Sequence, residues 1–302
     1  FLNTRFKRRE KDGTEINVAV NKPIEVLFEG SNTDIYKIVD KIPKTINDTI
    51  NDIPEDFNFL FVGHWLQGGL GADRKDIGML IKTFSEVFKN QKKKPGLILK
   101  SSGASFAETD KNELLRKIHS IQENIEGDLP NVYLLHGELT EEEMNGLYNH
   151  KKVKAHVSFT HGEGYGRPIQ EATLSGKPVI CSNWSGPVDF LDIELAVLIG
   201  GEVNKVASDS TNDWIMPESS WFTVNYSQAA SFMSAVYENY DLYTDNAKKL
   251  AKRNSEKFSL QAMDVEFAKI LDANLPEFSI HQEVNLPKLS KIGGSTPPQL
   301  KS

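Results

Sequence analysis

The sequence is poor in several features that would place it in particular classes of protein. Among its 302 residues it has one cysteine, Cys181, which excludes an intramolecular disulfide and a metal site built from several cysteines. No apolar run reaches the roughly 20 residues that a helix needs to cross a bilayer, so we expect no membrane span. The formal net charge of −7 argues against general nucleic-acid binding, which requires a basic surface.

The first residues, FLNTRFKRREKD, lack the apolar stretch of a signal peptide and do not begin with methionine. We therefore expect a cytoplasmic protein that is incomplete at its start. Hydrophobic residues make up 39% of the chain and charged residues 25%, which is ordinary for a globular protein. At this length the chain corresponds to one large domain or two small ones.

Short apolar runs alternate with segments of helical periodicity along most of the chain. The runs predict strands over residues 59–63, 96–100, 131–135, 155–159, 178–181 and 196–199. The spacing of apolar residues predicts helices over residues 77–88, 111–125, 140–148 and, as two or three helices, 226–271. This alternation is typical of an α/β fold, a Rossmann-like parallel sheet with helices on both faces. Ligands of such sheets bind at the carboxyl ends of the strands.

The segment HGEGYGRPIQEATLSGKPVICS, residues 161–182, is the most informative part of the sequence. It predicts a glycine-rich turn, a helix of about two turns and a return strand, with Pro168 at the first helical position. Gly176 falls just past the helix, where a left-handed backbone is needed. A helix that opens on such a turn presents free N–H groups to a phosphate. Glu163 and Glu171, with seven residues between them, suit hydroxyl groups, and a nucleotide sugar meets both demands.

This segment also resembles a known family. Its stretch EGYGRPIQEATLSGKPVI is similar to EGFGLPLLEAMACGKPVI, the signature of the retaining GT-B glycosyltransferases (glycosyltransferase family 4-like, glycosyl transferases group 1). Two acids, two glycines, a proline and the GKPV return keep the same register. The resemblance is strong over residues 59–191 and looser over the rest of 24–272. It implies a hexosyltransferase-type enzyme that moves a sugar from a nucleotide-sugar donor to an unknown acceptor with retention of the anomeric configuration.

The resemblance implies a domain organisation as well. GT-B enzymes have two Rossmann-like domains, and this chain resembles the carboxyl-terminal, donor-binding one. We expect residues 1–55, with a strand over Ile24–Phe28, to be a remnant of the amino-terminal acceptor domain and its linker. Residues 56–275 would form the nucleotide-sugar-binding domain, and residues 276–302, rich in proline, lysine and polar residues, a flexible tail. Because most of the acceptor domain is expected to be absent, the activity of this fragment by itself is open.

A second motif is the loop GHWLQGGLGADRKD, residues 63–76. In the family, the equivalent loop carries an arginine and a lysine that contact the donor diphosphate. Lys75 matches that lysine, His64 stands where the arginine is common, and Arg74 is a candidate to supply the missing charge. Since the family needs neither a metal nor a cofactor, the resemblance implies that cations and backbone N–H groups stabilise the leaving diphosphate.

The resemblance assigns roles to further residues. The expected catalytic set is Glu163, which would hold the sugar hydroxyls, together with Lys75 and Arg74. Glu171 is expected to bind the ribose diol. The other donor-binding residues are expected in the glycine-rich turn, in loop 63–76 and along the nucleotide base: Gly164, Tyr165, Gly166, Arg167, His64 and Gly137.

Other functions fit part of this pattern. A non-catalytic nucleotide-sugar-binding fragment and a nucleotide-sugar epimerase share the expected architecture, and both stay open. A nicotinamide-dependent dehydrogenase is disfavoured, because residues 162–166 lack the spacing G-x-G-x-x-G and no acidic partner stands at the end of a following strand. The sequence leaves open the base, the sugar and the acceptor. It also leaves open the oligomeric state, since the helical stretch after Tyr226 suits either the sheet or a second chain.

Overall fold

The computed structural model describes residues 6–19, 23–66, 68–211 and 215–276. The chain divides into two compact units, one formed by residues 25–267 and the other by the two ends of the chain, 1–24 and 268–302. The flexible tail expected from residue 276 onward lies outside the described residues, apart from Pro276 itself.

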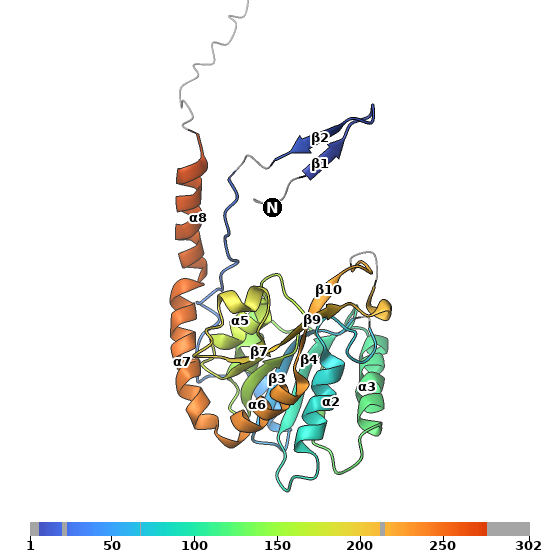
Figure 1. Ribbon diagram of the computed structural model, residues 1–302. Coiled ribbons are helices and arrows are strands. Elements are labelled where there is room, and N and C mark those ends of the chain that lie inside the picture. The colour runs from blue at the N-terminus through green and yellow to red at the C-terminus, as the bar shows by residue number, and fades with distance from the viewer. Residues whose placement is uncertain (1–5, 20–22, 67, 212–214, 277–302) are drawn as a thin grey trace, which may run out of the picture. The chain divides into compact units, whose positions relative to one another are not determined.

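The larger unit is built on a six-stranded sheet (Figure 1). Its strand order is β5-β4-β3-β6-β7-β8, and every neighbouring pair is parallel. The strands are β3 (Asn58–His64), β4 (Gly96–Ser102), β5 (Val132–Leu135), β6 (Val153–Ser158), β7 (Val179–Ser182) and β8 (Val197–Ile199). The predicted Rossmann-like α/β fold is therefore confirmed, and each of the six predicted strands between residues 59 and 199 is present.

Helices cover both faces of this sheet, because successive residues of the central strands point to opposite faces and are apolar on both. Phe59 and Phe61 of β3 face α2, α3 and α6, whereas Leu60 faces α1, α4, α5 and α7. These helices are α1 (Lys44–Asn51), α2 (Ile77–Phe88), α3 (Glu108–Glu123), α4 (Glu141–Asn149), α5 (Arg167–Thr173), α6 (Tyr226–Glu238) and α7 (Tyr240–Lys257). A further helix, α8 (Leu260–Asn274), has no buried residue.

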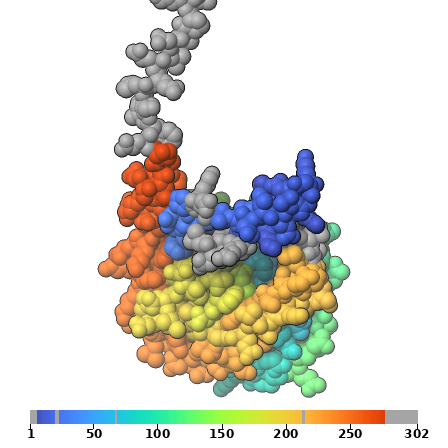
Figure 2. All heavy atoms as spheres, turned by 45° about the horizontal axis from the view of Figure 1, so that its top comes forward, coloured from blue at the N-terminus to red at the C-terminus, as the bar shows by residue number. Residues whose placement is uncertain are grey.

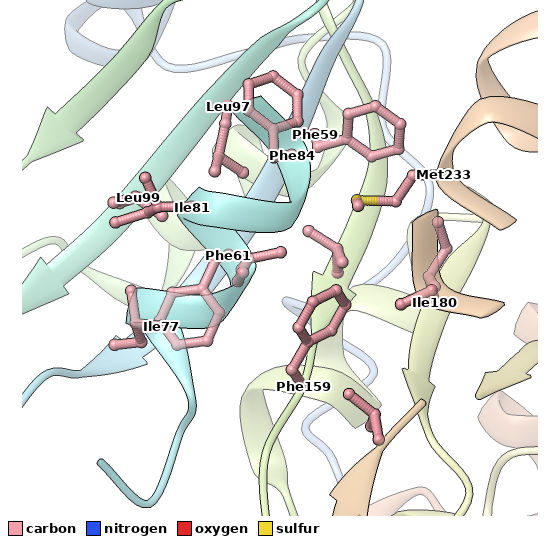
Figure 3. Packing of buried hydrophobic residues seen from close by; sticks show 14 of the residues in the cluster. Phe59, Phe61, Ile77, Ile81, Phe84, Leu97, Leu99, Phe159, Ile180 and Met233 are labelled. Atoms are coloured by element: carbon pink, nitrogen blue, oxygen red, sulfur yellow. The ribbon is translucent and has the colours of Figure 1, made fainter. Parts of the chain in front are cut away.

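The core on the α2 face consists of aromatic and aliphatic side chains (Figure 3). Phe59 and Phe61 are fully buried in one cluster with Ile81 and Phe84 of α2. The rings of Phe59 and Phe84 meet edge to face with their centroids 6.0 Å apart, which is a favoured arrangement. This packing fixes the carboxyl end of β3, where the loop of residues 65–76 leaves the sheet.

Several helix ends lie where capping residues predict them. Thr140 caps α4 by accepting a hydrogen bond from the Glu143 amide, and the Glu143 side chain accepts one from the Thr140 amide. Gly176 has a φ of 68°, which confirms the left-handed position after α5. Pro168 is the second residue of α5 rather than the first, because the left-handed Gly166 makes Arg167 the first helical residue.

The segment before the sheet differs from the prediction. Residues 24–28 form no strand. The Phe28 ring instead packs against those of Phe258 and Tyr165, with centroids 5.3 and 6.1 Å apart, so this apolar run is satisfied by side-chain contacts rather than by strand pairing. α1 is a helix that the sequence pattern does not predict, and its Ile46 and Ile50 are buried in the same core as α4 and α5. Assigning residues 1–55 to a remnant of another domain stays a prediction.

Two antiparallel hairpins add to the predicted elements. β1 (Phe6–Arg9) pairs with β2 (Glu15–Val18) in the smaller unit, and β9 (Gly201–Lys205) pairs with β10 (Ser220–Val224) in the larger one. β1 and β9 are exposed along their whole length, so no apolar periodicity reveals them. The Phe222 amide of β10 donates to the His161 carbonyl at 3.3 Å. In Figure 2 the light-orange surface that includes β9 and β10 lies next to the yellow surface that includes α5.

Candidate functional site

The candidate site lies at the carboxyl edge of the sheet, where the loops that follow β3 and β6 meet. These strands are neighbours in the sheet, so the segments that follow them leave the sheet side by side, beginning at Trp65 and at Phe159. The His161 amide donates to the Arg74 carbonyl at 2.9 Å, and Thr160 Oγ1 lies 3.3 Å from the same carbonyl. These contacts hold the first loop against the segment that carries Glu163.

Glu163 is bound by two cations. Lys75 Nζ lies 2.5 Å from Glu163 Oε1, Arg74 Nη1 lies 3.1 Å from Glu163 Oε2, and Thr160 Oγ1 donates to Glu163 Oε1 at 2.8 Å. The side chains of Glu163 and Lys75 are 9% and 12% exposed, whereas that of Arg74 is 48% exposed. Burial acts to raise the pKa of Glu163, but the charge and hydrogen bond of Lys75, with the charge of Arg74, hold that pKa below its usual value. Two cations and one carboxylate leave this cluster with a net positive charge.

The start of α2 positions these cations. The buried carboxylate of Asp73 accepts a hydrogen bond from the Lys75 amide at 3.1 Å. Asp76 takes the left-handed conformation, with a φ of 54°, so the chain turns sharply just before the helix. Positive charge is disfavoured ahead of a helix N-terminus. The ion pair with Glu163 offsets this cost and keeps Lys75 at the edge of the sheet.

The glycine-rich turn leaves backbone amides free beside the cations. Within the described ranges, the amides of Gly164 and Tyr165 have no hydrogen-bond partner, whereas the Glu163 amide donates to Ser185 Oγ at 2.9 Å. A Cβ placed on Gly164 would meet nothing within 4 Å, so the space there is open. Gly166 follows with a φ of 96°, a conformation that suits glycine. Free amides next to two cations can bind an anion.

Glu171 faces a different set of side chains. It lines a cavity of about 280 Å³ together with Glu29, Tyr36, Glu141 and Arg167. Arg167 Nη2 lies 3.4 Å from Glu171 Oε1 and 3.9 Å from Glu141 Oε1, and Arg167 Nε lies 3.8 Å from Glu29 Oε2. Burial raises the pKa of Glu171 to about 7, and the charge of Arg167 offsets this only in part. The two glutamates of the motif therefore have distinct surroundings. In the chain, the turn 164–166 and the first residues of α5 connect them.

Of the remaining predicted residues, His64 lies in a cavity beside the cations and Gly137 does not. His64 lines a larger cavity, of about 570 Å³, together with Arg74 and Lys75, and its Nδ1 lies 2.8 Å from Ser102 Oγ. Gly137 lines neither of these two cavities. Its φ is 118°, and its carbonyl accepts a hydrogen bond from Lys100 Nζ at 2.6 Å.

Three residues that the sequence motifs do not single out complete the site: Asp73, Thr160 and Ser185. Asp73 carries a signal in the sequence, because an aspartate shortly before an apolar helix is a common capping residue. Thr160 and Ser185 carry none, since their bonds to Glu163 depend on how segments distant in the sequence fold together. Across the part of the chain that the structure describes, no group of three or more histidine, cysteine, aspartate or glutamate side chains is arranged to hold a metal ion. No helix in that part combines the length and apolar character needed to cross a membrane.

The fold is that of the carboxyl-terminal, Rossmann-like domain of GT-B glycosyltransferases. Solved structures of such enzymes share it, although no protein-family model and no curated protein sequence matches this chain. HepE from Anabaena, solved in complex with UDP-glucose, matches with a TM-score of 0.56 and 18% identity, over 82% of this chain and 57% of HepE. The present chain thus spans little more than half the length of HepE.

Two other solved structures have a similar degree of likeness to this chain. The C-terminal domain of LpcC, a glycosyl transferase group 1 family protein from Francisella tularensis, matches with a TM-score of 0.51 and 15% identity, over 77% of this chain and 100% of that domain. Sucrose-phosphate synthase from Thermosynechococcus elongatus matches with a TM-score of 0.54 and 14% identity, over 81% of this chain and 51% of the synthase. At these sequence identities the likeness shows the fold alone.

Proposed function

We propose that this chain is the donor-binding half of a glycosyltransferase that moves a sugar from a nucleotide sugar to an acceptor. The observation that carries the proposal is the cluster of Glu163, Lys75 and Arg74 beside the free amides of Gly164 and Tyr165. A cationic site that also holds a carboxylate suits a ligand that combines a diphosphate with hydroxyl groups. The likeness to HepE supports the proposal, since that protein was solved with UDP-glucose.

In this proposal Lys75 and Arg74 stabilise the leaving diphosphate. Glu163 occupies only part of their hydrogen-bonding capacity, because an ammonium has three N–H donors and a guanidinium five. The other donors, with the two free amides, bind the phosphate oxygens on which charge develops as the sugar–phosphate bond breaks. Because Glu163 holds both cations in place beforehand, little reorganisation accompanies the reaction, which is the basis of electrostatic catalysis. The mechanism uses no metal ion and no cofactor.

The two glutamates bind the hydroxyl groups of the donor. Glu163 retains lone pairs that accept from the sugar ring, and Glu171 accepts from the two adjacent ribose hydroxyls. We also propose a hexosyl donor and retention of the anomeric configuration, on the resemblance carried by residues 163–180.

Calorimetric titration of Lys75→Ala tests the central role in this proposal. Removing a charged contact to a phosphate should weaken binding by about tenfold to a hundredfold, measured against a panel of UDP-, GDP- and ADP-sugars. Lys82→Ala is the matched control. Lys82 is exposed on α2, so its substitution removes the same charge away from the site. The proposal fails if no sugar nucleotide binds the wild-type chain, or if both variants bind as the wild type does.

The role of Glu171 is tested with two nucleotides. Glu171→Gln should weaken the binding of a ribonucleoside diphosphate more than that of its 2′-deoxy analogue, since only the former offers the complete diol. Equal losses for the two nucleotides would remove the ribose assignment.

A turnover assay separates the transferase from the two alternatives. Release of nucleoside diphosphate together with a sugar transferred in its original anomeric configuration is expected. A chemically altered sugar would favour the epimerase, and tight binding without turnover would favour a non-catalytic binding fragment.

A further inference from the structure

The cavity that contains Glu171 holds more carboxylates than a ribose requires. Glu29, Glu141 and Glu171 line it, and Arg167 is the one cation among its lining residues in the described part of the chain. Each carboxylate has an oxygen within 4 Å of the Arg167 guanidinium. One guanidinium cannot neutralise three carboxylates. Glu171 is 9% exposed, whereas the side chains of Glu29 and Glu141 are 55% and 49% exposed, so a ligand that covers these two acids has to replace their water with hydrogen-bond donors.

Tyr36 adds a free hydrogen-bond donor to the lining of this cavity. The residue lines the cavity and is 4% exposed, and its hydroxyl, which has no hydrogen-bond partner in the ranges that the structure describes, stays in contact with the solvent of the cavity. Burial and the nearby charge of Glu171 raise the pKa of Tyr36, so the phenol keeps its proton and can donate it to a ligand acceptor.

The bases of common nucleotides differ in what they offer to such a lining. The Watson–Crick edge of guanine presents one acceptor, O6, and then two adjacent donors, N1–H and the N2 amino group. A single carboxylate can accept both donors side by side, as it does from a guanidinium, while a hydroxyl donates to O6. Uracil presents one N–H between two carbonyl oxygens. Adenine and cytosine present an amino group beside a ring nitrogen that carries a lone pair. Each of these three bases turns an acceptor toward the carboxylate.

Glu141 is the acid best placed to bind a base edge. It is the first residue of α4, and the capping box of Thr140 and Glu143 fixes the backbone at this point. Glu29 lies in a segment without regular secondary structure. Glu171 already binds the ribose in the proposed complex. We infer that the donor is a guanine nucleotide sugar, with Glu141 binding the N1–H and N2 edge of guanine and Tyr36 donating to O6. This inference rests on the proposed function.

Calorimetry with GDP, UDP and ADP under identical salt and pH tests the inference on the unmodified chain. GDP should bind at least about tenfold more tightly than UDP or ADP, since a site built for two donors penalises a base that lacks them. Glu141→Gln should weaken GDP by about tenfold and leave UDP unchanged, because an amide offers one acceptor and one mismatched donor. Glu142→Gln is the matched control, because it removes the same charge from the next residue, which is exposed and does not line the cavity.

The outcomes separate this inference from the proposed function. If UDP or ADP binds as tightly as GDP, the guanine assignment is wrong and the transferase proposal stands. If none of the three nucleotides nor their sugars binds, the proposed function fails and the inference fails with it. A guanine preference that survives Glu141→Gln would overturn the role of Glu141. The comparison of nucleotides on the wild-type chain decides the base even if that variant does not fold.

Discussion

At the scale of single residues, Glu163 and Glu171 show how surroundings separate two identical side chains. Both are largely buried, and their side chains are each 9% exposed. Glu163 has Lys75 and Arg74 as ion-pair partners, which hold its pKa low. Glu171 has one partially exposed arginine shared with two other acids, so burial dominates and its pKa rises to about 7. Glu163 is therefore ionised throughout the neutral range, whereas Glu171 titrates within it.

This difference predicts a pH-dependent stability that Glu171 controls. Its folded-state pKa of about 7 exceeds the ordinary value of 4.5, so between these values the folded state binds more protons than the unfolded state. The free energy of unfolding should therefore fall as pH rises through this window, by about 3 kcal/mol from this group. Glu171→Gln should remove most of that loss. Urea unfolding at pH 5 and pH 8 measures the loss of stability, with Glu142→Gln as an exposed control. If the difference in the free energy of unfolding between the two pH values is the same in Glu171→Gln as in the wild type, the assignment is refuted.

At the scale of elements, the glycine-rich turn and α5 form one structural unit. Gly166 in the left-handed region starts the helix, and Gly176 in the same region follows its end. Between them α5 packs Ile169 and Ala172 into the core, so the turn before it has a fixed position. The free amides of residues 164 and 165 are thus held by a packed helix rather than by a free loop.

Alanine substitutions at two neighbouring glycines should separate these contributions. Gly166→Ala forces a left-handed conformation on alanine and places a Cβ 3.1 Å from Pro187 Cγ, so it should lower the free energy of unfolding by about 1–2 kcal/mol. Gly164→Ala meets open space and should change stability by less than about 0.5 kcal/mol. Urea denaturation of the two variants provides the comparison, and equal losses would contradict the role given to Gly166.

The elements themselves were largely predictable wherever apolar periodicity or a cap marks them. The predicted helix 77–88 coincides with α2, and Thr140 with Glu143 located the start of α4. Periodicity failed for β9, whose residues are all exposed, because a hairpin at the surface needs no apolar face. It also misled at residues 24–28, since an apolar run reports burial but not strand pairing.

At the scale of the whole molecule, strand order assembles the site. β3 and β6 are adjacent in the sheet although 88 residues separate Lys75 from Glu163, and this adjacency brings the two side chains together. Periodicity alone does not specify strand order. The resemblance of two motifs to one family is what predicted that both residues belong to one site. No motif marked Tyr36 or the crowding of acids around Arg167, because these contacts exist only in the folded chain.

The central claim is that Lys75, Arg74 and the turn amides bind the diphosphate of a sugar nucleotide. A crystal structure of this chain soaked with a nucleoside diphosphate tests it most directly. The account predicts phosphate oxygens within about 3 Å of Lys75 Nζ and of the Gly164 and Tyr165 amides. A diphosphate bound elsewhere, with those amides still without partners, would contradict it.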